Sequence, residues 1–73
     1  MKLKILQIGI GSMGKRRLRD LSMRNDVELA AYDVRKDRRE YAQQKFIVKT
    51  FESITEAMDW NPKALIISTP PDK

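Results

Sequence analysis

The chain has 73 residues, with no cysteine and no histidine, and its 15 lysines and arginines against 10 aspartates and glutamates give a formal net charge of +5. This length suffices for one small domain with a marginal core, and the composition excludes disulfides, thiolate chemistry and histidine as a metal ligand or general base. No apolar run approaches the length of a membrane span, and the first residues lack the apolar core of a signal peptide, so we expect a cytoplasmic protein.

The first predicted element is a strand over residues 3–8, which leads directly into a glycine-rich loop. Gly9, Gly11 and Gly14 have the spacing G-x-G-x-x-G. Between a strand and a helix, these glycines allow a tight turn, close approach of the backbone to a pyrophosphate and close packing of the helix on the strand. The alternative is a plain strand-to-helix turn, which needs only one or two glycines.

A helix is predicted to follow, from Ser12 to about Arg24. Its apolar positions fall at i, i+4 and i+7 on one face, at Gly14, Leu18 and Leu21. Lys15 and Arg16 near its start oppose the helix dipole, a penalty that a bound anion would reverse. A solvated basic face explains these two residues equally well.

The middle of the chain predicts a second strand over residues 27–32, a charged helix over 36–45 and a short third strand at residues 47–48. The charged helix has a thin apolar face and is expected to be peripheral. Its apolar residues are Tyr41, Ala42 and Phe46.

The last third predicts a short helix and a fourth strand. Ser53 and Glu56 match a capping box, so a helix should begin there and bury the residues Ile54, Ala57 and Met58. Asn61-Pro62 should end it. Residues 64–68 are an apolar run that indicates a buried, central strand.

This alternation of strands and helices predicts an α/β fold with parallel strands and right-handed crossovers. We expect an incomplete Rossmann-like sheet, βαβαβαβ, with strand order 3-2-1-4. Residues 1–73 would form the N-terminal portion of a dinucleotide-binding domain, without a catalytic or substrate domain.

Asp33 is the second candidate for cofactor binding. It ends the second predicted strand, nineteen positions after Gly14 (33 − 14), where dinucleotide-binding folds place an acid that bonds the adenosine ribose. A carboxylate there repels the 2′-phosphate of NADP and favours NAD. Arg35 and Arg38 complicate this preference, because an arginine can accept that phosphate. The alternative is a solvated aspartate in a turn.

The segment after the fourth strand should face the glycine loop. With order 3-2-1-4, the strand order reverses between the first and fourth strands, where ligands bind in open α/β sheets. We therefore expect four residues near the nicotinamide half of a cofactor: Ser68, Thr69, Pro70 and Pro71. A rigid loop without a ligand is the alternative.

The sequence contains no recognisable catalytic group, because its acids are scattered and no nucleophile stands beside a base. A basic helix without interleaved aromatic residues argues only weakly for nucleic-acid binding.

Three motifs carry a resemblance to a known family: Gly9-Ile-Gly-Ser-Met-Gly14, Tyr32-Asp33 and Ile66-Ile-Ser-Thr-Pro-Pro71. A fourth motif, Asp59-Trp-Asn-Pro62, precedes the predicted fourth strand. With these motifs the chain resembles, over its whole length, the N-terminal end of the glucose–fructose oxidoreductase/inositol dehydrogenase (Gfo/Idh/MocA) family.

The resemblance implies a nicotinamide-dependent oxidoreductase acting on sugars, cyclitols or related polyols. It implies a pyrophosphate site lined by Gly9, Ile10, Gly11, Ser12, Met13 and Gly14. It places the adenosine at Asp33 with Arg35 nearby, and the inner cofactor pocket at residues 68–71. The family's Glu-Lys-Pro motif and its catalytic lysine and histidine would come later than Lys73.

Two functions from different classes follow. The chain is the NAD-binding part of an oxidoreductase, or it is a non-enzymatic nucleotide-sensing or interaction module. In the second case it would assemble through an exposed edge of its fourth strand, since an unpaired apolar edge is a template for association.

Overall fold

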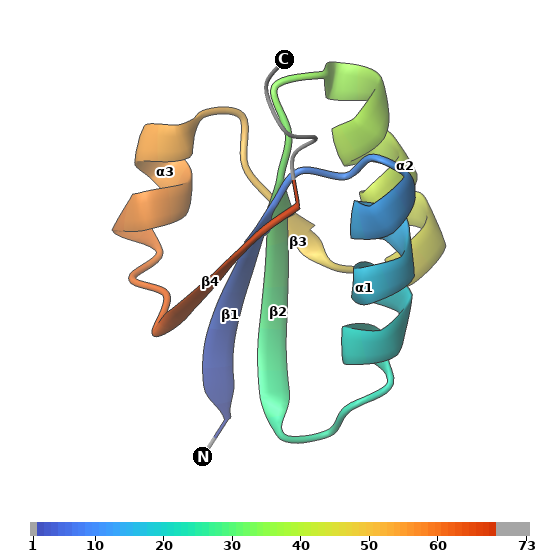
Figure 1. Ribbon diagram of the computed structural model, residues 1–73. Coiled ribbons are helices and arrows are strands. Elements are labelled where there is room, and N and C mark those ends of the chain that lie inside the picture. Colours follow the sequence, from blue (N-terminus) through green and yellow to red (C-terminus); the bar gives the residue numbers. More distant parts are fainter. Residues whose placement is uncertain (1, 69–73) are drawn as a thin grey trace.

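The computed structural model describes residues 2–68. Strands and helices alternate along the chain (Figure 1). The elements are β1 (Leu3–Ile8), α1 (Ser12–Ser22), β2 (Val27–Tyr32), α2 (Lys36–Phe46), β3 (Lys49–Thr50), α3 (Ile54–Asp59) and β4 (Ala64–Ile67).

The four strands form one parallel sheet in the order β3-β2-β1-β4. In register, Leu6 of β1 lies between Ala30 of β2 and Leu65 of β4. Parallel strands at this spacing require crossover helices. The predicted α/β class and the strand order 3-2-1-4 are confirmed.

Each face of the sheet packs against helices. Helices α1 and α2 lie on one side of the strands and α3 lies on the other (Figure 1). The core on the first side contains Ile10, Leu18, Ala31, Ala42 and Val48. The core on the second side contains Leu6, Ala30 and Ala57, with the rings of Phe51 and Trp60 packed against it. Because period-2 alternation sends neighbouring strand residues to opposite faces, Ala30 and Ala31 serve different cores.

The first two helices match the predicted positions with small shifts at their ends. Helix α1 ends at Ser22 instead of about Arg24, because the chain turns at Met23 and Arg24 pairs with Asp26 at 2.8 Å. Helix α2 extends one residue beyond the prediction, to Phe46. Within it, Ala42 is fully buried, which agrees with the thin apolar face expected for a peripheral helix.

The third strand was predicted two residues too early. Ile47 has a left-handed backbone (φ 54°) that ends α2, and its side chain is 88% exposed. Val48 is buried, but pairing with β2 begins only at Lys49. Ile47 therefore ends α2 and Val48 packs into the core, and neither residue belongs to the strand.

The predicted N-cap of α3 at Ser53 is confirmed, whereas the return bond of the capping box reaches Glu52, one residue before the N-cap, and not Ser53 itself. The hydroxyl of Ser53 accepts a hydrogen bond from the backbone N–H of Glu56 at 3.1 Å, and the Glu56 carboxylate accepts from the N–H of Glu52. The predicted buried face is wrong, however, because only Ala57 is buried. Ile54 and Met58 are 42% and 46% exposed, since this helix of six residues covers the sheet with a single small side chain.

The fourth strand is an edge strand among residues 2–68, which contradicts the expectation of a central, buried position. Leu65 and Ile67 point to the α3 side and are 46% and 66% exposed. Strand β4 ends at Ile67, one residue before the predicted end.

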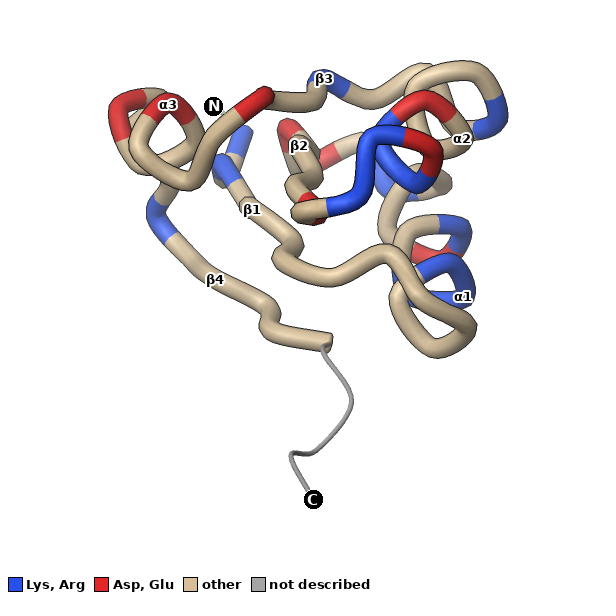
Figure 2. The backbone as a smooth tube through the Cα atoms, turned by 90° about the horizontal axis from the view of Figure 1, so that it is seen from above, with Lys and Arg blue, Asp and Glu red and all other residues tan. Residues whose placement is uncertain are grey.

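Charge is unevenly spread over the elements. Figure 2 shows lysines and arginines gathered on α1 and α2, whereas α3 carries acidic residues and β4 is uncharged. Within residues 2–68, no helix has the length and apolar character needed to cross a membrane.

A candidate dinucleotide-binding site

The first and third glycines of the loop have structural roles. Gly9 has a φ of 102°, a backbone conformation that side chains rarely tolerate, and its N–H donates to the carbonyl oxygen of Tyr32 at 2.8 Å. A Cβ atom on Gly14 would overlap the carbonyl oxygen of Gly9 and lie 3.0 Å from the Gly9 carbonyl carbon. These two glycines therefore make the tight turn and bring α1 against the end of β1.

The side chain of Gln7 in β1 holds this loop in place by hydrogen bonds. It is fully buried, and its side-chain amide nitrogen donates to the carbonyl oxygens of Gly9 (3.1 Å) and Gly14 (2.7 Å). The two bonds join the start of the turn to the first turn of α1. The amide oxygen, Oε1, is buried without a partner among residues 2–68, so it is the two bonds from Nε2 that fix the loop that precedes the helix.

Gly11 is different, because space remains above it. A Cβ atom there would meet one neighbour at ordinary contact distance, Nη1 of Arg38 at 3.7 Å. The N–H of Lys15 donates to the Gly11 carbonyl oxygen at 2.8 Å and so begins the helix. The four backbone N–H groups that precede Lys15, those of Gly11, Ser12, Met13 and Gly14, donate to no acceptor within residues 2–68. An open glycine and unused donors at a helix start fit a pyrophosphate group.

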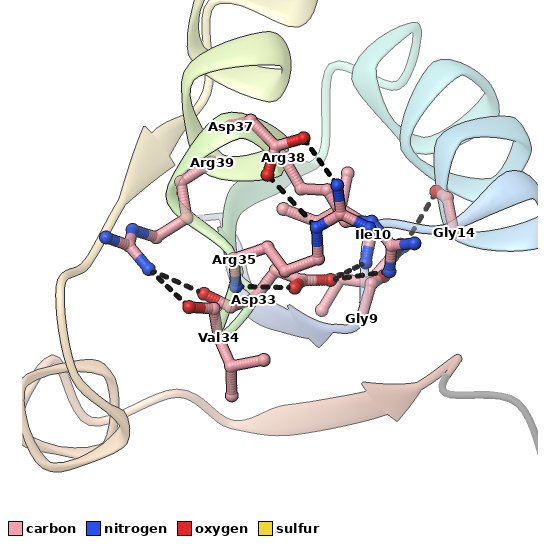
Figure 3. A network of polar contacts seen from close by, with 10 residues as sticks. Gly9, Ile10, Gly14, Asp33, Val34, Arg35, Asp37, Arg38 and Arg39 are labelled. Carbon is pink, nitrogen blue, oxygen red and sulfur yellow. Dashed lines mark hydrogen bonds and ion pairs between the residues drawn. The ribbon is translucent and has the colours of Figure 1, made fainter.

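Asp33 is bound to the loop by its side chain. Its carboxylate is buried, accepting from the N–H of Ile10 at 2.7 Å on Oδ2 and from the N–H of Arg35 at 2.9 Å on Oδ1 (Figure 3). A carboxylate offers about four acceptor positions, so capacity remains for further donors such as ribose hydroxyls. The carboxylate of Asp33 thereby links the end of β2 to the glycine loop by a hydrogen bond.

Three arginines surround Asp33, and each is held differently (Figure 3). Arg35 pairs with Asp37 through two hydrogen bonds of 3.1 and 2.9 Å, which hold the pKa of Asp37 below its ordinary value. Arg39 donates from Nη1 to the carbonyl oxygens of Asp33 and Val34. Arg38 reaches back from α2, with Nη1 lying 3.6 Å from Oδ2 of Asp33. The guanidinium nearest the loop is thus that of Arg38, and Arg35 is directed to another acid.

The remaining candidates in the loop differ in how they face the site. The side chain of Ile10 is fully buried in the core beside Leu18, so only its backbone is available to a ligand. Ser12 is exposed and Met13 is 66% exposed at the start of α1.

The expected opposite wall is described only at its first residue. Ser68 follows β4, and its N–H donates to the carbonyl oxygen of Ile8 at 2.8 Å. Its hydroxyl is buried and has no partner among residues 2–68. The end of β4 therefore adjoins the end of β1, next to the glycine loop. Thr69, Pro70 and Pro71 lie outside the described residues.

A parallel βαβ unit, a glycine loop held against the first helix and a buried aspartate at the end of β2 define a Rossmann-type dinucleotide-binding fold. Two solved structures share this fold and 28% sequence identity: a myo-inositol 2-dehydrogenase from Lactobacillus plantarum and an NAD-binding protein from Listeria innocua. Each superposes with a TM-score of 0.82, over 96% and 99% of this chain respectively. The expected resemblance to inositol dehydrogenases is thus confirmed.

The same fold also occurs with another chemistry. A prephenate dehydrogenase from A. aeolicus, solved with NAD⁺, superposes over 96% of this chain with a TM-score of 0.82 at 23% identity, which shows the fold alone. This chain spans 22% of the length of the L. plantarum and Listeria proteins and 25% of the A. aeolicus protein. No protein-family model and no curated protein matches it.

Two features of the site escaped the sequence analysis. Gln7 reads as one polar residue in an apolar strand, and the signal was its position on the face toward α1, two residues before the first glycine. Arg38 lies close to Gly11 because of where α2 begins and of the direction of the Arg38 side chain. Neither can be predicted from the sequence alone.

Proposed function

We propose that this chain binds NAD as the cofactor-binding part of an oxidoreductase that transfers hydride between the nicotinamide and a sugar, cyclitol or related polyol. The observation that carries the proposal is that the amides of Gly11–Gly14, which donate to no acceptor within residues 2–68, lie in the same loop that the Ile10 N–H joins to the buried carboxylate of Asp33. The polyol substrate rests on the likeness to an inositol dehydrogenase at 28% identity.

In this proposal, each element contributes a separate interaction. The amides at the start of α1 donate to the pyrophosphate, and the dipole of α1 favours its charge. Gly11 lets the phosphates approach the backbone. Asp33 accepts from the ribose hydroxyls, and Ser68 with Thr69, Pro70 and Pro71 lines the nicotinamide side. NAD would supply the hydride acceptor, and these residues bind and orient it.

Titration with NAD by calorimetry tests the proposal. We expect saturable binding by the wild-type chain and binding at least about tenfold weaker in Asp33→Asn, because each hydrogen bond to a charged group contributes about 1.5–3 kcal/mol. Asp37→Asn is a matched control, since Asp37 is exposed and faces Arg35. Equal NAD affinity in wild type and Asp33→Asn would contradict the proposal.

A second candidate is an interaction module that assembles through β4. Its support is the position of β4 at the sheet edge, with Leu65 and Ile67 exposed. Sedimentation analysis of wild type and Ile67→Lys separates the two. Association that Ile67→Lys abolishes, without NAD binding, favours the module. NAD binding by a monomer favours the oxidoreductase part.

A further inference from the structure

A small pocket lies between α1 and α2, the two helices that pack side by side on one face of the sheet (Figure 2). Its volume is about 280 Å³, and it shares no residue with the candidate dinucleotide site. Each helix contributes part of the lining, which consists of Lys15, Arg16, Arg19, Tyr41, Lys45 and Phe46. Four of these residues are cations and none is an acid, so the pocket concentrates positive charge.

The four cations of this pocket have no ion-pair partner in the described part of the chain. The two acids of α2, Asp37 and Glu40, pair instead with cations at the start of that helix. Lys15 and Arg19 are four positions apart on α1, where like charges repel each other and destabilise a helix. An anion bound in the pocket would relieve this repulsion.

Two aromatic rings hold one of the cations at the pocket. The ammonium group of Lys15 lies 4.2 Å from the centre of the Tyr41 ring, which is the geometry of a cation–π contact. The rings of Tyr41 and Phe46 meet edge to face, with centres 6.0 Å apart. Phe46 in turn packs against the core. Aromatic packing, and not a counter-ion, therefore positions Lys15.

The charge and size of the pocket indicate a compact ligand with two phosphate groups. Arginine binds phosphate through parallel hydrogen bonds, and lysine binds it as a point charge. Each phosphate monoester carries about −1.5 to −2 charges near neutral pH, so two such groups match four cations. Proteins that bind single-stranded nucleic acid use long grooves with open ring faces. Here the pocket is small, and Lys15 covers one face of Tyr41.

We infer that this pocket binds a diphosphate group, held by the three cations of α1 together with Lys45 of α2. The site is separate from the glycine loop, and the inference does not depend on the proposed dinucleotide function. The ligand is either the free diphosphate ion or an organic molecule that ends in a diphosphate, since both present the same charged group.

Titration of the chain with inorganic pyrophosphate, followed by NMR of the aromatic ring protons, tests the inference. At about 0.15 M salt, exposed charges more than about 8 Å away are screened. The ring signals of Tyr41 and Phe46 should shift saturably. Arg19→Ala and Lys45→Ala should each weaken binding about three- to tenfold, because a charge-assisted contact is lost. The matched control Arg17→Ala removes an exposed charge of α1 outside the pocket and should change binding less than about twofold.

A second pair of variants tests the aromatic part of the pocket, with circular dichroism to check folding. Tyr41→Leu removes the ring that positions Lys15 and should weaken pyrophosphate binding, as measured at the Phe46 ring. Tyr41→Phe keeps the ring and should bind like wild type. Equal affinity in Tyr41→Leu and wild type would contradict the inference, because a basic surface without a positioned cation would behave in that way.

Other anions identify the class of ligand. ADP that shifts the rings at lower concentration than pyrophosphate assigns an organic diphosphate, and the reverse order assigns the free ion. The inference is wrong if citrate or oligothymidylate binds more tightly than both, if Arg17→Ala weakens binding as much as Arg19→Ala, or if millimolar pyrophosphate leaves the rings of the folded chain unshifted. The amides of Gly11–Gly14 report on the dinucleotide site in the same sample, so shifts at these amides alone would leave the proposed function standing.

Discussion

The carboxylate of Asp33 accepts a hydrogen bond from the backbone N–H of Ile10 at 2.7 Å, which ties the end of β2 to the glycine loop after β1. The two residues are 23 positions apart in sequence, and parallel pairing of β1 with β2 brings them together. Because the bond is buried, the loop and the acid that would bind adenosine hold each other in place.

Removing this bond should destabilise the fold as well as weaken NAD binding. In Asp33→Asn, one of the two backbone donors faces an NH₂ group and loses its acceptor, which should lower the free energy of unfolding by about 1–3 kcal/mol. Urea denaturation measures it. Asp37→Asn, an exposed change in the same segment, should leave the free energy of unfolding nearly unchanged, because exposed ion pairs contribute little. Equal losses in the two variants would show that the Ile10 bond contributes little.

Alanine at Gly14 should mainly reduce stability, whereas alanine at Gly11 should mainly reduce NAD binding. Gly14→Ala places a methyl group against the Gly9 carbonyl, so unfolding free energy should fall by about 1–3 kcal/mol or more. Gly11→Ala has room for its methyl group and should cost less than about 1 kcal/mol. Its methyl group would instead obstruct the pyrophosphate and weaken NAD. Denaturation and calorimetry on both variants separate the two roles, and a stable Gly14→Ala would contradict the packing.

At Gln7, a charged replacement should reduce the stability of the fold more than an apolar one. Gln7→Leu removes two donors from the Gly9 and Gly14 carbonyls and should cost about 1–3 kcal/mol. Gln7→Glu buries a carboxylate against the same oxygens, and burial raises its pKa. The Gln7→Glu penalty should therefore shrink as pH falls, because the protonated form regains one donor. A penalty for Gln7→Glu that does not change with pH would count against this arrangement.

The pairing of Arg35 with Asp37 makes a prediction about pH. Hydrogen bonds from Arg35 lower the pKa of Asp37. The contribution of this pair to folding stability is therefore fully present above the ordinary pKa of Asp37 and is lost as pH falls through the lowered value. NMR titration of the carboxyl carbon should show a low pKa in wild type and an ordinary one in Arg35→Ala. Asp26, paired with Arg24, should keep its lowered pKa in both proteins.

The sequence predicted the features that depend on period and spacing. Strands β1 and β2 were placed at their observed bounds, because apolar runs next to the glycines and before Asp33 leave little freedom. The N-cap of α3 was placed correctly at Ser53, immediately before the helix begins at Ile54, because capping chemistry is local. Local signals of this kind are readable without knowledge of tertiary contacts.

What could not be predicted depends on neighbours distant in sequence. Ile47-Val48 resembles a strand by composition, but the left-handed turn at Ile47 ends α2 and moves pairing to Lys49. Leu65 and Ile67 indicate a buried strand, but their exposure depends on what covers β4. At the candidate site, side-chain direction decided that the guanidinium of Arg38, and not that of Arg35, faces the carboxylate of Asp33.

An amide NMR titration of the chain with NAD tests most directly whether the glycine loop binds a dinucleotide. If the loop binds the pyrophosphate, the amides of Gly11, Ser12, Met13 and Gly14 should shift in a saturable way, and the same titration of Asp33→Asn should need much higher NAD. If a folded wild-type chain shows no shift at these four amides at millimolar NAD, the loop is not a dinucleotide site and the account is wrong.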